Sequence, residues 1–145
     1  MKNNRQSKPV FEILEHTADI GLRAWGAGPA ELFAHAGLAL QSIAVEMEKV
    51  TERAAYPIAA EGEDYESLLV NFLNEVLYYL DGERVVMGRF EIDRISPESV
   101  SGRGWGEPRD PERHPPKLVV KGVTYHQLEV VHNAGRWTAR VFLDI

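Results

Sequence analysis

Two apolar stripes at helical spacing constrain the fold of this 145-residue chain more than any other feature. The first stripe follows Gly28-Pro29, and proline suits the first turn of a helix because its missing N–H is not needed there. The second follows Asp64, has acidic residues in its first turn, and ends at Asp81-Gly82. The stripes consist of Leu32, Phe33, Ala36, Leu40, Ile43 and Met47, and of Leu68, Leu69, Phe72, Leu73, Val76 and Leu80.

Most of the remaining segments favour strands, because apolar and β-branched residues alternate with polar ones between turn signals. We expect strands at 10–15, 21–25, 54–60, 85–95, 99–105, 117–123, 128–132 and 136–144. The last two form a hairpin across a three-residue loop, 133–135, that ends in glycine. The sequence therefore predicts an α+β fold of two layers, with two helices packed on a mainly antiparallel sheet. We expect residues 1–9 to form a flexible N-terminal tail and residues 10–145 to form a single domain.

Composition excludes several classes of protein. The chain has no cysteine, which excludes disulfides, thiolate metal sites and a thiol nucleophile. The polar N-terminus lacks a secretory signal, and no apolar run approaches the ~18 residues of a membrane span. We therefore expect a cytoplasmic protein that does not bind membranes. The net charge of -6 argues against strong direct nucleic-acid binding, so any service to RNA is expected to pass through another protein.

Residues 105–116 interrupt the strand pattern with four prolines and six charged or imidazole side chains. Prolines fix the backbone and remove donors from a sheet, so we expect a stiff, exposed excursion. Long irregular segments in compact domains are often functional, and the rigidity favours that interpretation here. We expect Arg109, Arg113 and His114 to face a partner.

Acidic groups are expected to meet at one end of the final strand. That strand runs directly into Asp144 and Ile145, so a side-chain carboxylate and the terminal carboxylate would lie one residue apart. Two such anions repel each other unless a cation or hydrogen-bond donors compensate them. With Asp19 added, three carboxylates would suit a hard cation such as Ca²⁺ or Mg²⁺. The simpler alternative is that Asp144 is a solvated strand end.

Two further segments concentrate chemical groups. His16 and Asp19 could ligate a metal or position a base, although Asp19 could equally be a turn residue that bonds its own backbone. Residues 121–126 include Lys121, Tyr125 and His126, which could contact a partner or make ordinary hydrogen bonds at a strand end. His126 could act as a general base, but no nucleophile is spaced to reveal its target. The sequence contains no phosphate-binding glycine loop, zinc signature or nucleophile elbow, so it does not describe an obvious enzyme.

Taken together, five segments in this order resemble the archease family. They are residues 11–21, 67–70 with 73–75, 105–108 with 110–114, 121–126, and 139–145. The resemblance covers nearly all of the chain from Val10 onward. Gly122 stands where the family usually has alanine.

The resemblance implies a noncatalytic accessory protein for an RNA-splicing ligase of the RtcB type, which joins tRNA halves or repairs broken RNA. Such a protein promotes guanylylation of the ligase and its multiple turnover, and it widens the choice of nucleotide triphosphate. The resemblance also implies a divalent-cation site formed by Asp19, Asp144 and Ile145, most readily for Ca²⁺, with Mg²⁺ or Mn²⁺ as alternatives. It implies a module of strand–helix–strand–strand type. We expect His16, Lys121, Tyr125 and His126 to face the ligase.

Two other hypotheses come from different functional classes. A small metal-dependent phosphoester hydrolase would use His16, Asp19 and His126 around a cation. A purely structural interaction module would need none of these side chains.

Overall fold

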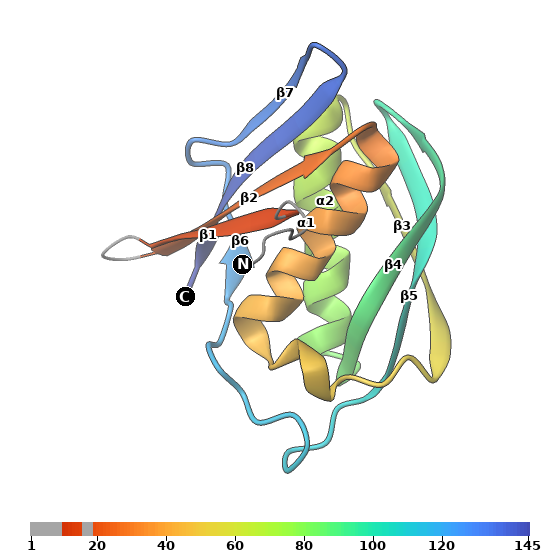
Figure 1. Ribbon diagram of the computed structural model, residues 1–145, viewed down its shortest axis with the longest axis vertical. Coiled ribbons are helices and arrows are strands. Elements are labelled where there is room, and N and C mark those ends of the chain that lie inside the picture. Colours follow the sequence, from red (N-terminus) through yellow and green to blue (C-terminus); the bar gives the residue numbers. More distant parts are fainter. Residues whose placement is uncertain (1–9, 16–18) are drawn as a thin grey trace, which may run out of the picture.

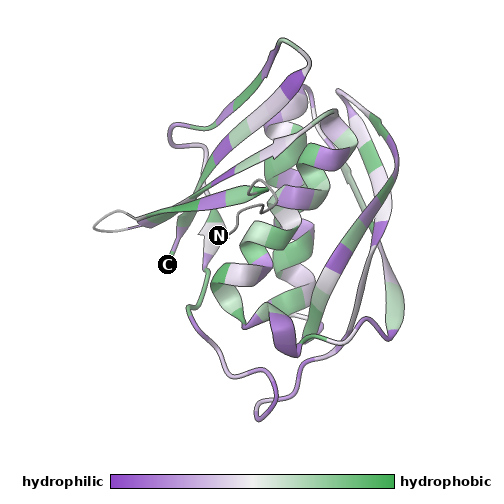
Figure 2. Cartoon of the chain, viewed as in Figure 1, coloured by the Kyte–Doolittle hydropathy of each residue, from purple (hydrophilic) through white to green (hydrophobic). Residues whose placement is uncertain are grey.

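Two antiparallel sheets enclose two α-helices in the part of the chain that the structure describes, residues 10–15 and 19–145 of a computed structural model (Figure 1). The predicted tail at 1–9 lies outside these residues. The first helix, α1, packs against a strand of each sheet, and the second helix, α2, packs against the second sheet. The core therefore lies between the sheets, and Figure 2 shows hydrophobic residues running along both helices.

Both helices form where the apolar stripes predict them. The helix α1 spans Pro29–Ala44, with Gly28 as N-cap and proline in its first turn. The helix α2 spans Tyr65–Asp81, and its N-cap Asp64 accepts a hydrogen bond from the main-chain N of Ser67 at 2.8 Å. Met47 is not part of α1, because the chain becomes extended at Val45, and it lies instead in the short 3-10 helix η1, Met47–Lys49.

The first sheet has the order β1-β2-β8-β6, and β7 also pairs with β8. The second sheet has the order β3-β5-β4. The strands of the first sheet are β1 Phe11–Glu15, β2 Asp19–Gly26, β6 Gly122–Val123, β7 Glu129–Asn133 and β8 Arg136–Asp144. Those of the second are β3 Ala54–Glu61, β4 Val85–Ser96 and β5 Ser99–Pro108.

The α+β class, with two helices and antiparallel strands among the described residues, is confirmed. The strands do not form the single sheet that the sequence predicted, because the helices bury more than one side. Glu31 is the one charged residue of α1, and the buried residues of that helix extend over about half of its circumference. An apolar face this wide packs against more than one layer. At Gly37 an added Cβ would lie 2.9 Å from the ring of Phe90, so α1 approaches β4 closely.

Three boundaries in the first sheet differ from the sequence prediction. The strand β2 begins at Asp19, within what was predicted as a connection. The loop between β7 and β8 has two residues, Ala134 and Gly135, both with positive φ, because Asn133 pairs with Arg136. The predicted strand 117–123 is reduced to Gly122–Val123. Within the described residues, no helix has the length and apolar character needed to cross a membrane.

Candidate functional site

Asp19 and Asp144 lie directly opposite each other at one end of the first sheet. They are the first register pair of the antiparallel strands β2 and β8. Opposite residues of such a pair share one face of the sheet, with Cβ atoms about 4.5–5.5 Å apart. Two carboxylates that the sequence separates by most of the chain are therefore neighbours, as the sequence analysis proposed.

The segment 121–123 borders Asp144 on its other side. Gly122 pairs with Asp144, and the main-chain N of Lys121 donates a hydrogen bond to the Asp144 carbonyl at 2.7 Å. A Cβ added at Gly122 would meet nothing within 4 Å. The space beside Asp144 is therefore open, and the alanine usual in the family would fit at this position.

A tight loop after β6 places Tyr125 and His126 beside the same strand end. The main-chain N and Oγ1 of Thr124 donate to the carbonyl of Phe142 at 3.0 and 3.1 Å, and His126 N donates to Thr124 Oγ1 at 3.2 Å. The His126 ring lies 5.9 Å from the ring of Phe142, and Tyr125 is 61% exposed. Lys121, Tyr125 and His126 are thus brought together with Asp144, and all three are exposed.

The aromatic ring of Phe142 lies next to the two carboxylates on the same face of the sheet. Phe142 precedes Asp144 by two positions along β8 and so lies on the same face of the sheet as that residue. Its partner in β2 is Gly21, where an added Cβ would lie 2.8 Å from Phe142 Cε1. Gly21 therefore makes room for the ring, which is only 2% exposed.

The two carboxylates are fewer than the ligands that a hard cation needs. Within the described ranges, no three His, Cys, Asp or Glu side chains are grouped so that they could hold a metal ion. Asp19 and Asp144 supply two carboxylates, so a third protein ligand has to be a main-chain oxygen, as the predicted role of Ile145 requires. Ile145 is partly buried and packs against the core next to Asp144. His16 lies outside the described residues.

A second cluster forms around Glu107, whose side chain is 1% exposed. Arg113 Nη1 donates to Glu107 Oε1 at 3.0 Å, and the main-chain N of Thr51 donates to Oε2 at 2.9 Å. His114 Nε2 lies 2.9 Å from the same Oε2. Burial on its own raises the pKa of Glu107, but the hydrogen bonds from Arg113, Thr51 and His114 outweigh it and lower the pKa to about 2.

His114 does not face a partner, which corrects the sequence prediction. Its ring is fully buried, and Nδ1 accepts a hydrogen bond from the main-chain N of Asp110 at 2.9 Å. A nitrogen that accepts is unprotonated, so the proton lies on Nε2, which points to Glu107 and to the Lys49 carbonyl. Both ring nitrogens are therefore occupied within the fold.

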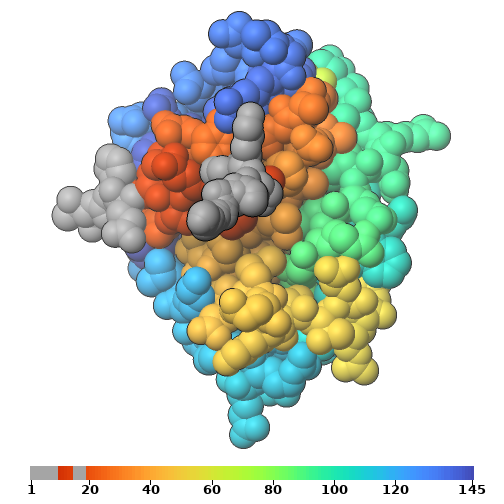
Figure 3. Space-filling model, in the orientation of Figure 1, coloured from red at the N-terminus to blue at the C-terminus, as the bar shows by residue number. Residues whose placement is uncertain are grey.

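Arg113 shares this structural role although its side chain is 46% exposed. Its Nη2 donates to the carbonyl of Lys49 and to Thr51 Oγ1, at 3.2 and 3.1 Å. The cluster thus ties the excursion to the segment after α1, and Figure 3 shows these two parts of the chain against each other at the lower end of the molecule. The predicted excursion also begins later than expected, because β5 extends to Pro108.

Arg109 lies outside both groups. Its main-chain N donates to the carbonyl of Arg84 at 2.7 Å. Partial burial lowers the pKa of Arg109, and the nearby positive charge of Arg84 lowers it further. Its partner-facing role stays a prediction.

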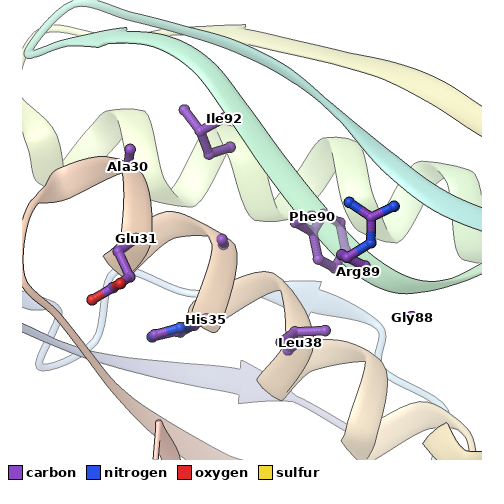
Figure 4. Close-up of a pocket in the computed structure, with 9 residues that line it drawn as sticks. Ala30, Glu31, His35, Leu38, Gly88, Arg89, Phe90 and Ile92 are labelled. Carbon is purple, nitrogen blue, oxygen red and sulfur yellow. The ribbon is translucent and has the colours of Figure 1, made fainter.

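A hollow between α1 and β4 lies away from these residues (Figure 4). It has a volume of about 530 Å³ and an apolar lining that includes Leu38, Phe90 and Ile92. His35 borders it, but its Nδ1 lies 2.5 Å from the Trp25 carbonyl, so it donates there and links α1 to the end of β2. This hollow holds none of the predicted site residues.

The buried cluster is the part of the site region that the sequence analysis missed. Glu107 lies in the segment 105–116, where charges and prolines are the most conspicuous feature of the sequence. One signal was present, because Glu107 is the one acid of β5, in a strand that otherwise carries glycine and apolar residues around it. Acids in such strands are rarely fully buried without a cationic partner.

These features define a small α+β protein in which two carboxylates oppose each other at the end of a sheet. The model of the archease protein family matches residues 11–145, and this chain belongs to that family. The archease of Pyrococcus furiosus is 40% identical over 139 residues, which cover 93% of this chain and 98% of the relative. The archease of Methanosarcina mazei is 39% identical over 139 residues and 95% of its own length.

Solved structures show the same fold. Protein 1598 of Methanobacterium thermoautotrophicum superposes with a TM-score of 0.77 at 29% identity, covering 94% of this chain and 99% of that one. An archease from Thermotoga maritima, described as a possible chaperone, gives a TM-score of 0.60 at 20% identity over 99% of this chain and all of that one.

Proposed function

We propose that this protein is a noncatalytic activator of an RNA-splicing ligase of the RtcB type. Membership of the archease family supports the proposal. The observation that carries it is the placement of Asp19 opposite Asp144, with Lys121, Tyr125 and His126 beside them. These groups lie on an accessible end of the sheet, where a second protein can reach them.

The proposed activator binds a divalent cation through Asp19, Asp144 and the terminal carboxylate of Ile145. Carboxylate oxygens are the ligands that Ca²⁺ and Mg²⁺ prefer, and Mn²⁺ is also compatible with them. The cation would supply positive charge between two groups that otherwise repel each other. Beside this site, Lys121 offers an ammonium group, Tyr125 a phenol and His126 an imidazole for contact with the ligase surface.

The proposed activator promotes guanylylation of the ligase, so that one ligase molecule completes many joining reactions and uses a broader set of nucleotide triphosphates. Its own chain performs no bond-making step in this scheme. Strong direct binding to RNA is not expected, because the chain has a net charge of -6. The proposed place of action is the cytoplasm.

The direct test counts RNA joins per ligase molecule with the activator present in less than stoichiometric amount. We expect multiple turnover with the wild-type protein and a loss of stimulation in Asp144→Asn. Glu98→Gln is a matched control, because Glu98 is exposed and its carboxylate has no partner among the described residues. Equal joining with and without the protein would refute the proposed function.

The role of Ile145 can be tested by extending the chain beyond it with a short glycine-serine segment. The extension converts the carboxylate into an uncharged amide, so we expect weaker cation binding and weaker stimulation. An extended protein with unchanged cation affinity would remove Ile145 from the ligand set. The hydrolase hypothesis predicts instead that the isolated protein cleaves a phosphoester and that a chelator abolishes the cleavage.

A further inference from the structure

Residues 117–121 have the composition of a β-strand but no strand partner in the described part of the chain. The sequence predicts a strand over 117–123, whereas only Gly122–Val123 pairs with β8. The main chain of Leu118, Val119 and Val120 takes part in none of the hydrogen bonds found among the described residues. Main-chain N–H and C=O groups without a partner in the fold are available to a strand from another chain.

Hydrogen bonds within the chain hold both ends of the segment. The main-chain N of Lys117 donates to the carbonyl of Ala44 at 2.9 Å, and its Nζ donates to the carbonyl of Ser42 at 2.8 Å. At the other end, Lys121 N donates to the Asp144 carbonyl at 2.7 Å. Val120, within the segment, is only 2% exposed and packs in the core. A partner strand would therefore lose little affinity to the ordering of this segment.

Two large aliphatic side chains of the segment remain in solvent. Leu118 is 41% exposed and Val119 is 64% exposed. They are adjacent in the chain and precede Val120, which is buried. β-Branched residues also favour strand geometry, so this segment is suited to pairing as well as free to pair.

Charge indicates which strand would pair here. The whole chain has a net charge of -6, but residues 109–121 contain four basic residues, Arg109, Arg113, Lys117 and Lys121, against two acids. Antiparallel pairing with a second copy, centred on Val119, would place Lys117 opposite Lys121 of the other copy. Like charges in opposite positions destabilise a strand pair, so self-association is disfavoured and an acidic partner strand is favoured.

We propose that residues 117–121 accept an extended strand of a partner protein in which aliphatic residues stand between two acidic ones. The partner strand pairs with the main chain of 118–120, packs its aliphatic side chains on Leu118 and Val119, and places its carboxylates near Lys117 and Lys121. This docking site goes beyond the proposed function, because it requires neither the cation nor a particular ligase. It can therefore be tested with a peptide and can fail separately.

The test is a nuclear magnetic resonance titration of the ¹⁵N-labelled full-length protein with a capped pentapeptide that has three valines between two glutamates. We expect chemical-shift changes at the amides of 117–121 and slower hydrogen exchange at 118–120, with a dissociation constant near ~1 mM. A peptide with lysines in place of the glutamates should bind at least about tenfold more weakly. An absence of changes at 117–121, or an equal response to both peptides, overturns the proposal.

Substitutions at Val119 separate main-chain pairing from side-chain contact. Val119→Pro removes an N–H donor and still permits an extended residue before it, so we expect at least about tenfold weaker binding. Val119→Thr is the matched control, since it keeps the N–H and the β-branch, and it should bind within about threefold of wild type. Val119→Asp adds a charge that repels the peptide glutamates, and should also weaken binding. Wild-type affinity in both Val119→Pro and Val119→Asp would contradict docking at this segment.

Discussion

Glu107 and Asp144 are carboxylates near the ends of two strands in different sheets, β5 and β8, and their surroundings differ completely. Glu107 is buried and receives hydrogen bonds from Arg113, His114 and the main chain of Thr51. Asp144 is exposed, lies opposite a second carboxylate in Asp19, and its side chain has no hydrogen bond or ion pair among the described residues.

The difference shows that the surroundings of a carboxylate determine whether it stabilises the fold or is available to bind a ligand. The charge of Glu107 is compensated within the chain, so its interactions stabilise the native state and leave nothing for a partner. The carboxylate of Asp144 has no such partner among the described residues, and it lies opposite Asp19, where a cation from outside the chain can bind. Removing either charge should therefore have opposite effects in the two regions.

The largest effect is expected from Glu107→Gln. The variant replaces a buried carboxylate that accepts several hydrogen bonds with a neutral amide, and losing hydrogen bonds to a charged group costs about 3 kcal/mol of unfolding free energy. Urea unfolding followed by circular dichroism measures this loss. Glu112→Gln, at an exposed acid of the same excursion, should change the free energy by less than about 0.5 kcal/mol. If both variants unfold at the wild-type urea concentration, the buried cluster does not stabilise the fold.

The stabilising contribution of Glu107 should also depend on pH. The pKa of Glu107 is lowered from 4.5 to about 2, so its contribution is present above pH 4.5 and is lost as the pH falls towards about 2. The difference in unfolding free energy between wild type and Glu107→Gln should therefore shrink across this window. Unfolding curves at several pH values test the expectation. A difference that stays constant from pH 6 to about pH 2.5 is the contrary result.

A smaller loss is expected from Gly21→Val. The added Cβ would lie 2.8 Å from Phe142 Cε1, closer than van der Waals contact, so the ring must move, at a cost of about 2 kcal/mol. Gly122→Ala is the control, because its added Cβ has open space, and it should be within about 0.5 kcal/mol of wild type. Thermal unfolding of both variants measures the difference. Equal stability would mean that Phe142 is not held where the structure places it.

The smallest effect in the absence of a cation is expected from Asp144→Asn, and its sign should change when Ca²⁺ is added. Without a cation the variant removes a like-charge contact, so the unfolding free energy should rise by about 0.5 kcal/mol. With Ca²⁺ at about 100 times its dissociation constant, the wild type should gain about 2.7 kcal/mol and become the more stable protein. Thermal scans with chelator and with Ca²⁺ measure both states. The same order of stability in both conditions would count against cation binding.

The sequence predicts the helices and strands better than it predicts how the strands divide into two sheets around the helices. Capping at Asp64 and proline at the first turn of α1 locate the helices, because these signals are local. The division of the strands between two sheets depends on long-range packing, and the near absence of charge on α1 was the available signal for it. The two-residue turn at Ala134-Gly135 was missed because alanine rarely adopts positive φ.

The chemistry of the residues predicts the pair of acids, whereas the burial of His114 depends on the three-dimensional packing of the chain. Asp19 and Asp144 were singled out as acids at chain positions that could meet, and their register in the sheet places them opposite each other. His114 was assigned to a partner because it lies in a charged, proline-rich segment. Its burial follows from contacts with Lys49 and Glu107, which no local pattern encodes.

The most direct test of the account compares Ca²⁺ binding by calorimetry in the wild type, Asp144→Asn and Glu107→Gln, each at a temperature where it is folded. The account predicts one binding event in the wild type and in Glu107→Gln with the same affinity. It predicts an affinity at least about tenfold lower in Asp144→Asn, whose unfolding free energy in chelator is not reduced. Equal Ca²⁺ affinity in the wild type and Asp144→Asn, or its loss in Glu107→Gln, would contradict the assignment of these two regions.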